Sequence, residues 1–219
     1  ILIDGYVDLS IVAIMKNEAP YVKEWIDYHR LVGVKRFYIY DNESTDNLTE
    51  VLTPYIEQGV VIYKYWPGLK KDGIQTKAYN ECVINYKEKN EWLALIDADE
   101  FIVPKKKNTI PEFLKDYEAY PGVGINWLCY DSNGYIKKPS GGVLESYTRC
   151  HFDKQNPKNH HIKSVIRPVK VKNINNPHYC FYTNNESAVT ENKEKILVSP
   201  AAKLMHHNYI GGLVQHTFE

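Results

Sequence analysis

The sequence lacks the features that mark several classes of protein. No apolar run approaches the roughly 20 residues of a membrane-spanning helix, and no signal peptide is visible. Lysine plus arginine and aspartate plus glutamate both number 27, so the net charge is zero and predicts no basic surface for nucleic acid. The chain does not open with methionine, which leaves room for a missing upstream segment. At 219 residues we expect one domain with a substantial core.

Cysteine and glycine motifs are also missing. The cysteines at positions 82, 129, 150 and 180 are far apart, without the paired spacing of a metal site. We expect reduced core residues, and one disulfide is the open alternative. No Gly-x-Gly-x-x-Gly follows the first predicted strand, and no Gly-x-x-x-x-Gly-Lys occurs. Dinucleotide binding and a P-loop are therefore disfavoured.

Short apolar strands alternate with helices in the first half of the chain. Strands are predicted at residues 7–15, 35–40, 60–65 and from 92 onward, and helices at 19–32, 47–58 and 74–89. This alternation favours a parallel sheet with right-handed crossovers, which is an α/β fold. His29 lies on the apolar face of the first helix, where a packed, hydrogen-bonded side chain is expected rather than a ligand.

The second half is less regular. A helix is predicted at residues 110–120, a strand at 123–130 and a helix or turn around 143–150. A strand lies near residues 160–168, and an asparagine-rich, hairpin-like region covers 183–195.

The stretch from Trp92 to Phe101 carries the strongest chemical signal. Trp92 to Ile96 predicts a strand buried on both faces, which runs directly into Asp97 and Asp99. Residues i and i+2 of a strand point the same way, so both carboxylates can converge on one ion. Open α/β sheets bind ligands at this edge, and Mg²⁺ or Mn²⁺ prefers oxygen ligands and accepts substrate phosphates. The alternative is a solvated acidic turn.

Polar residues also follow the first two predicted strands. Asn17 and Glu18 come after the first strand, and Asp41 opens a polar cluster after the second. That cluster can bind a ribose or a base, or its Ser44 or Thr45 can cap the next helix.

Several stretches, in order along nearly the whole chain, form one combined pattern: Asn17-Glu18, Tyr21 to His29, Tyr38 to Asp46, Gln75 to Cys82, Trp92 to Ile102, Lys163 to Pro168, Asn176-Pro177-His178 and Lys203 to His206. Together they resemble glycosyltransferases of the family 2 and family 92 type. The resemblance implies a single GT-A-type domain over residues 1–219, with a Rossmann-like, mostly parallel sheet flanked by helices. Its nucleotide-binding half would cover about 1–103 and an irregular acceptor-side half about 104–219.

The resemblance further implies an Mn²⁺- or Mg²⁺-dependent, inverting transfer of a sugar from a nucleotide sugar, in particular a UDP-sugar, to a glycan or lipid-linked acceptor. By resemblance, these residues would hold the nucleotide and diphosphate: Asn17, Glu18, Asp41, Gln75, Asn80, Asp97, Lys163 and Arg167. Asp97 and Asp99 would serve the metal, with His206 as a third ligand and His178 as its rival. For each residue the alternative is a structural hydrogen bond or a solvated charge.

An inverting transfer needs a base that takes the proton of the acceptor hydroxyl. Asp131 follows an apolar strand at the entry of a glycine-containing turn and is the first candidate, with Glu145 second. The alternative for Asp131 is a turn-forming aspartate that bonds its own backbone. The chain departs from the family in residues 130–134 and 207–212, which puts the acceptor side in question.

The leading hypothesis is therefore a glycosyltransferase of surface polysaccharide synthesis. A non-catalytic saccharide-binding or partner-docking module is the alternative, and a sugar nucleotidyltransferase is disfavoured because the loop at residues 15–20 contains no glycine. Glycosylation sequons at Asn42 and Asn47 fall in or beside the expected nucleotide pocket, and a third lies at Asn185. They favour a compartment without N-glycosylation, such as a bacterial cytoplasm, and a lipid-linked acceptor would bring the chain to the inner membrane face. The oligomeric state is not predicted.

Overall fold

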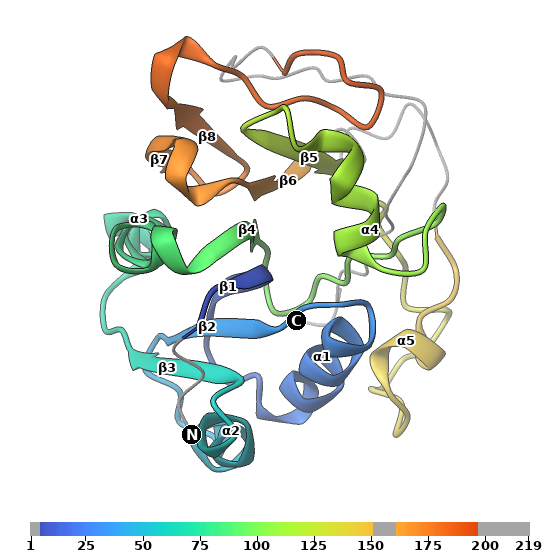
Figure 1. The fold of residues 1–219 in the computed structure, drawn as a ribbon. Helices are drawn as coiled ribbons and strands as arrows, with labels where there is room; N and C mark the ends of the chain where they lie inside the picture. The colour runs from blue at the N-terminus through green and yellow to red at the C-terminus, as the bar shows by residue number, and fades with distance from the viewer. Residues whose placement is uncertain (1–4, 151–160, 197–219) are drawn as a thin grey trace.

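A six-stranded sheet flanked by helices organises the computed structural model, which describes all residues except 1–4, 151–160 and 197–219 (Figure 1). The strand order is β3-β2-β1-β4-β6-β5. The parallel strands are β1 (Val7–Met15), β2 (Arg36–Asp41), β3 (Val61–Tyr65) and β4 (Asn90–Leu95). β6 (Ile162–Ile166) runs antiparallel to both β4 and β5 (Gly122–Asn126). The predicted α/β class with a mostly parallel sheet is confirmed.

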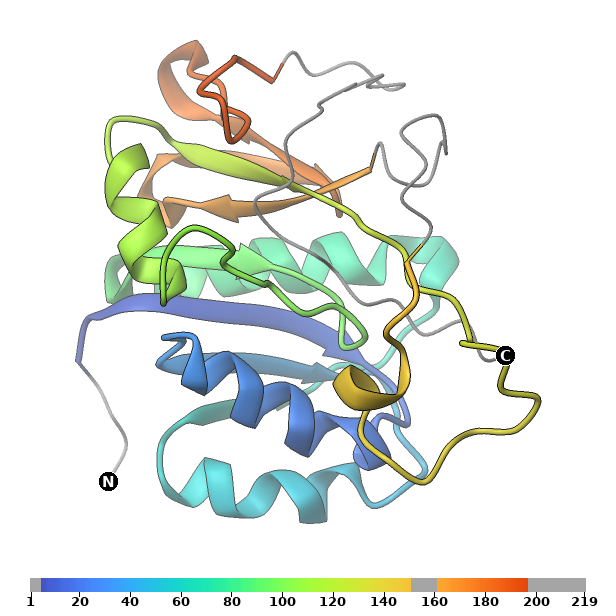
Figure 2. The same ribbon diagram turned by 90° about the vertical axis from the view of Figure 1, so that its right-hand side faces the viewer.

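Two long helices and the short α4 (Ile110–Leu114) cover one face of the sheet, and another helix covers the opposite face (Figures 1 and 2). α1 (Ala19–Leu31) and α2 (Leu48–Glu57) pack on the face that includes Leu9 and Ile11 of β1. α3 (Ile74–Tyr86) packs on the opposite face. Alternate residues of β1 therefore enter two separate cores, as the period of two in a strand requires.

The α1 helix forms where the sequence predicts it. Val22, Trp25, Ile26 and His29 are buried at helical spacing, and a proline stands in the first turn. The His29 imidazole is fully buried, hydrogen-bonded to the Trp25 carbonyl through Nδ1 and to the backbone N–H of Ile102 through Nε2. His29 is thus the packed histidine that was expected.

A second sheet lies where no strand was predicted. β7 (Val171–Asn176) and β8 (Tyr179–Tyr182) form an antiparallel hairpin on the α3 side of the main sheet. The Asn176 side chain accepts a hydrogen bond from the backbone N–H of His178 and closes the turn. The prediction placed a hairpin only further along, at 183–195, where a Val189–Lys195 bridge lies.

The acceptor-side half departs from its predicted boundaries. α4 (Ile110–Leu114) gives way to a 3₁₀ turn at Lys115–Tyr117, so the predicted helix is shorter. The strand predicted at 123–130 ends at Asn126, which pairs with Ile162 at the start of β6, and one further backbone bond, from Trp127 to His161, follows the ladder. α5 (Val143–Ser146) is a single turn.

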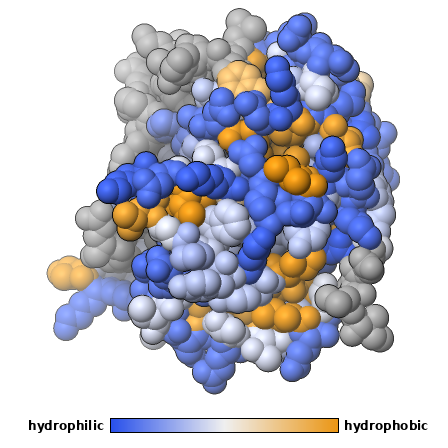
Figure 3. Space-filling model, turned by 90° about the vertical axis from the view of Figure 1, so that its left-hand side faces the viewer, coloured by the Kyte–Doolittle hydropathy of each residue, from blue (hydrophilic) through white to orange (hydrophobic). Residues whose placement is uncertain are grey.

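The surface of the described chain is mixed in character. On the face shown in Figure 3, hydrophobic patches are interspersed with hydrophilic side chains. No helix among the described residues has the length and hydropathy to cross a bilayer. The cysteines are free; Cys82, Cys129 and Cys180 are buried as expected, and Cys150 is exposed.

Candidate active site

The carboxyl edge of the parallel strands gathers acidic side chains. Asp97 and Asp99 follow β4 after Ile96, and Glu18 stands at the N-terminus of α1, directly after β1. β1 and β4 are adjacent and parallel, so their carboxyl ends meet at one place. Glu18 lies close enough to Asp99 for the Asp99 charge to raise its pKa.

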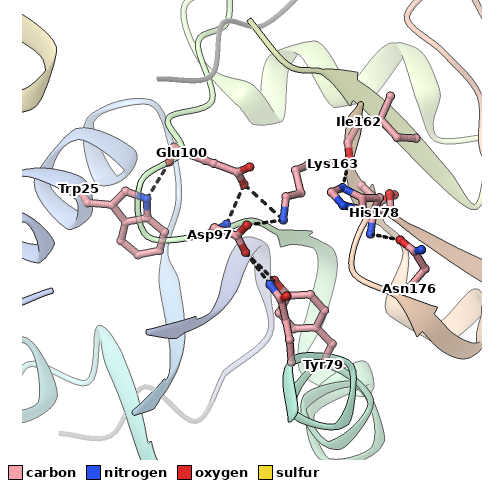
Figure 4. A network of polar contacts seen from close by, with 10 residues as sticks. Trp25, Tyr79, Asp97, Glu100, Ile162, Lys163, Asn176 and His178 are labelled. Atoms are coloured by element: carbon pink, nitrogen blue, oxygen red, sulfur yellow. Dashed lines mark hydrogen bonds and ion pairs between the residues drawn. The ribbon is translucent and has the colours of Figure 1, made fainter. Parts of the chain in front are cut away.

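The Asp97 carboxylate is held from two elements (Figure 4). Its Oδ1 accepts hydrogen bonds from Gln75 Nε2 at 2.6 Å and Tyr79 Oη at 3.4 Å, both on α3. Its Oδ2 pairs with Lys163 Nζ of β6 at 2.8 Å. These contacts fix the orientation of a carboxylate that stays 36% exposed, so its remaining lone pairs can meet a ligand.

Glu100 completes a buried charge cluster behind Asp97. Glu100 Oε2 accepts from the backbone N–H of Asp97 at 2.7 Å and lies 3.6 Å from Lys163 Nζ. Burial and then the Asp97 charge raise the pKa of Glu100 to about 8. Burial alone would lower the pKa of Lys163, but the Glu100 and Asp97 carboxylates outweigh it and raise the pKa. A charged Lys163 between the Asp97 and Glu100 carboxyl groups offsets part of the negative charge of the cluster.

Asp99 and Glu18 also carry raised pKa values. Burial, and secondarily Asp97, raise the pKa of Asp99 to about 6. Burial, followed by Asp99 and Asp46, raises the pKa of Glu18 to about 7, while Lys138 opposes the shift. Lys163 opposes the shift of Asp99 as Lys138 opposes that of Glu18, so burial and acidic neighbours outweigh the nearby cations at both carboxyl groups.

Asn17 and Asp41 support this edge through hydrogen bonds of their own. Asn17 adopts φ 59°, and its Oδ1 accepts from the backbone N–H of Thr45 at 2.7 Å. Asp41 is 3% exposed and accepts from the backbone N–H of Ser44 at 2.9 Å and from Tyr63 Oη at 2.7 Å. Both residues shape the loop beside Glu18, and their predicted contact with a nucleotide stays a prediction.

Two predicted ligands lie elsewhere, which corrects their assignment. Arg167 lies beyond β6 and pairs with Glu91 at 2.5 Å. Glu91 is at the start of β4, so this pair lies at the opposite end of the strand from Asp97. Asn80 bonds both backbone groups of Ile174, at 2.7 Å and 3.0 Å, and ties α3 to β7. Arg167 is paired with Glu91 away from Asp97, and the amide of Asn80 is bonded to Ile174.

The candidate bases have local partners. Asp131 Oδ1 accepts from the backbone N–H of Asn133 at 2.7 Å, and Oδ2 pairs with Arg149 at 3.3 Å. This is the turn-forming role that was the alternative for Asp131. Glu145 Oε1 accepts from the backbone N–H of Gly142 at 2.8 Å and caps α5. Their catalytic assignment stays a prediction.

The two rival histidines differ in what can be said of them. His206 lies outside the described residues. His178 is in the β7–β8 turn and lies next to Lys163 of β6. Its Nδ1 bonds the Ile162 carbonyl at 3.0 Å (Figure 4). Burial, and then the Lys163 charge, lower the pKa of His178, so the imidazole is neutral at pH 7.

Sequence analysis missed Tyr79 and Glu100 as parts of the site. Tyr79 is on the same face of α3 as Gln75, four residues on, which is a spacing that patterns can reveal. Glu100 looked like part of the acidic turn, and its contacts with Lys163 and with the backbone N–H of Asp97 explain how its carboxyl group can be buried.

The residues fit a divalent cation that shares its ligands with a substrate. Within the described ranges, no three His, Cys, Asp or Glu side chains form a metal site by themselves. Mg²⁺ sites for nucleotides often use one or two carboxylates together with substrate phosphates, so Asp99 and Asp97 suffice in such a site. The raised pKa values of Asp99 and Glu18, beside the oriented and partly exposed Asp97, are the observation that fits.

A separate cavity of about 350 Å³ lies between β6, β8 and residues 185–196. It is lined by Ser164, Cys180 and Tyr182 among others, and it contains none of the predicted site residues. The carboxylate edge is therefore the better candidate for chemistry.

Sequence comparison identifies the family of this chain. Residues 12–214 match the profile of Glycosyltransferase family 92. The chain belongs to glycosyltransferase family 92. Family 92 proteins of Oryza sativa subsp. japonica and Arabidopsis thaliana are each 32% identical to it, over 164 and 174 residues. The matches cover 73% and 74% of the chain but 27% and 29% of these relatives, so the chain spans less than a third of their length.

Solved structures share the fold of the family 92 chain. S. aureus TarS 1-349 matches with a TM-score of 0.52 and 13% identity, over 97% of the chain and 59% of TarS. Its complex with UDP-GlcNAc matches with a TM-score of 0.53 and 11% identity, over 97% and 60%. At these identities the similarity shows the fold alone.

Proposed function

We propose that this family 92 chain is the donor-binding and transfer domain of a metal-dependent, inverting glycosyltransferase that uses a UDP-sugar. The observation that carries the proposal is the pairing of Asp99 with Glu18 beside an oriented Asp97, at the carboxyl edge of β1 and β4. Family membership and the fold shared with TarS, one structure of which holds UDP-GlcNAc, support it.

Different residues of the chain would bind the metal, bind the nucleotide and orient Asp97. Asp99 and Asp97 would hold Mn²⁺ or Mg²⁺, and Asn17, Glu18 and Asp41 would line the nucleotide side. Gln75, Tyr79 and Lys163 would fix the Asp97 carboxylate. The bound cation would supply positive charge for the leaving diphosphate.

Transfer also needs proton removal at the acceptor. The acceptor oxygen attacks the anomeric carbon as the bond to the diphosphate breaks, and a base takes the hydroxyl proton. Asp131 is proposed as this base and Glu145 as its substitute. Either one would have to give up a local backbone contact to face the acceptor.

A thermal-shift experiment tests donor binding. UDP, GDP, CMP and dTDP are each added with and without Mn²⁺ to the chain, to Asp99→Ala and to Asp116→Ala. A ligand that binds only the folded state raises its stability, by about 2.7 kcal/mol at a hundred times its Kd. We expect a Mn²⁺-dependent shift with UDP that Asp99→Ala loses. Asp116 is exposed on the 3₁₀ turn before β5, at the other edge of the sheet, so Asp116→Ala should keep the shift.

Two outcomes would redirect the proposal. The absence of a shift with every nucleotide would favour a non-catalytic saccharide-binding module. A shift that needs no metal and survives Asp99→Ala would remove the metal role from the two aspartates. Release of UDP from a UDP-sugar, measured with a coupled assay, then separates a transferase from a binding module.

The biological setting is proposed more broadly. A glycan or lipid-linked acceptor, surface polysaccharide synthesis and a cytoplasmic location at a membrane face stay predictions, and the curated relatives named above are plant proteins. The structure adds one constraint on N-glycosylation. Asn42 Nδ2 donates to the carbonyls of Trp66 and Gly68, both at 3.0 Å, and a glycan on that nitrogen would replace one of these two N–H donors.

A further inference from the structure

Three aromatic rings meet at the carboxyl ends of β4 and β5, next to the charge cluster. The Trp127 indole lies 5.0 Å from the His161 ring and 5.5 Å from the His178 ring, measured between centroids. The two imidazoles are 5.4 Å apart. Trp127, His161 and His178 are hereafter the aromatic triad. Trp127 and His178 are partly exposed and His161 is exposed, so the aromatic triad reaches the surface, while Trp127 also packs against the core.

The backbone fixes each ring in place. Trp127 follows β5. Its backbone N–H donates to the His161 carbonyl at 2.9 Å, and this bond continues the β5–β6 ladder by one step. His178 comes from the β7–β8 turn, and its Nδ1–H donates to the Ile162 carbonyl. That bond selects the tautomer in which Nε2 is the hydrogen-bond acceptor. The aromatic triad is thus assembled from separate elements whose positions are set by hydrogen bonds.

The position of the aromatic triad relates it to the donor site. β6 lies between β4 and β5, and Lys163 of β6 contacts Asp97 on one side with His178 on the other (Figure 4). The carboxyl ends of β1 and β2, which would hold the nucleotide, lie on the other side of Asp97 from the aromatic triad. A ligand that runs from those ends past Asp97 would bring its sugar toward the aromatic triad.

The Trp127 indole is not accounted for by structural bonding. Its Nε1 is buried and has no hydrogen-bond partner in the described part of the chain. An unpaired buried donor is rare in folded proteins and calls for an explanation. Phenylalanine at this position would provide similar packing without the unpaired N–H. The indole is therefore better explained by its large aromatic face than by its polar group.

We propose that the aromatic triad is a subsite for a pyranose ring. The face of the Trp127 indole packs on the C–H groups of the sugar, and His178 Nε2 accepts a hydrogen bond from a sugar hydroxyl. An aromatic side chain with an apolar body and a polar edge suits a ligand that has both kinds of surface. The inference rests on the proposed function, because it takes the transferred or the accepting sugar as the occupant. Both sugars offer the same ring chemistry, and the experiment distinguishes them.

Indole NMR tests the subsite directly. The chain has 4 tryptophans, so a ¹⁵N-labelled sample gives few indole signals, and Trp127→Phe assigns one of them to Trp127. Methyl β-D-glucoside, methyl β-D-galactoside and methyl α-D-mannoside are added at tens of millimolar, with UDP and Mg²⁺ present. UDP-glucose, UDP-galactose and UDP-GlcNAc are added separately and compared with UDP. We expect at least one sugar to shift the Trp127 signal beyond the change that UDP causes.

Affinity measurements on variants identify the source of the sugar. Trp127→Ala should weaken binding of that sugar at least about fivefold, and Trp127→Phe should restore part of it because a ring face remains. Loss of UDP-sugar affinity with UDP affinity unchanged assigns the donor sugar, and loss confined to the methyl glycoside assigns the acceptor. Phe181→Ala is the matched control, since Phe181 is a partly exposed aromatic residue of the same hairpin outside the aromatic triad.

The two proposals fail in different ways. UDP that binds without any sugar perturbing Trp127 overturns the subsite and leaves the proposed function standing. Failure of UDP to bind overturns the proposed function, and a methyl glycoside that still shifts Trp127 then makes the aromatic triad a saccharide site of a binding module. A Trp127→Ala variant that keeps full sugar affinity also overturns the subsite.

Discussion

At the scale of single residues, His29 shows how burial sets a charge state. Burial lowers the pKa of His29 from 6.5 to about 3, and the hydrogen bond to Trp25 opposes this only weakly. Both ring nitrogens are engaged in a way that suits the neutral imidazole. Between these two pKa values the unfolded chain binds a proton that the folded chain does not.

His29 should therefore make the fold sensitive to acid. Stability rises with pH between about 3 and 6.5, so lowering the pH from 7 to 5 should cost about 2 kcal/mol through this residue. Urea denaturation at the two pH values measures the loss. Glu100, with its raised pKa, acts in the opposite direction, so the comparison is made with His29→Gln. If His29→Gln loses as much stability as the parent chain, the assignment to His29 is wrong.

At the scale of elements, Asn80 illustrates a polar side chain that joins two parts of the fold. Its amide bonds the backbone N–H and carbonyl of Ile174, a residue that is 2% exposed. The bonds connect α3, which carries Gln75 and Tyr79, to the hairpin that carries His178. A residue that appeared to be a nucleotide ligand in the sequence is thus a link between two elements of the site.

Asn80→Ala should destabilise the fold without a direct loss of UDP contacts. Leaving two buried backbone groups of Ile174 unpaired should cost about 2–4 kcal/mol in the free energy of unfolding. Asn85→Ala is the control, because Asn85 is exposed on the same helix and bonds only Glu81. Chemical denaturation measures both variants, and UDP affinity is determined well below the unfolding transition. A loss of UDP affinity without a loss of stability would favour the ligand role instead.

At the scale of the whole molecule, the direction of the strands decides which charges can act together. The parallel strands direct their carboxyl ends to one edge, where Asp97, Asp99 and Glu18 lie. Antiparallel β6 places Lys163 at the carboxyl ends of the parallel strands. Arg167, only four residues later, lies at their amino ends. Two basic residues of one motif therefore have different environments.

This polarity predicts different effects on donor binding. Arg167→Met should leave the affinity for UDP unchanged, because its partner Glu91 stands at the start of β4. Gln75→Ala should weaken Mn²⁺-dependent UDP binding roughly tenfold, since it removes a group that orients Asp97. Isothermal titration calorimetry with UDP and Mn²⁺ measures both variants. Weaker UDP binding by Arg167→Met would contradict the placement of this residue at the opposite edge.

The sequence by itself determined the elements whose patterns are local. β1 lies at Val7–Met15 as predicted, and Asp97 and Asp99 follow a buried strand, because periodicity and strand ends depend on neighbouring residues. The strand predicted at 123–130 was too long because its end depends on where distant β6 begins. The β7–β8 hairpin was missed because its strands are short and only partly buried.

Only the tertiary structure decided which side chains share a site. Lys163 reaches Asp97 across 66 positions of sequence because β6 pairs antiparallel with β4 in a specific register. A register shift of one residue would turn Lys163 to the other face of the sheet. The aromatic triad depends in the same way on the β5–β6 ladder and the hairpin turn. Residue types and strand ends are written locally, whereas convergence is a property of long-range pairing.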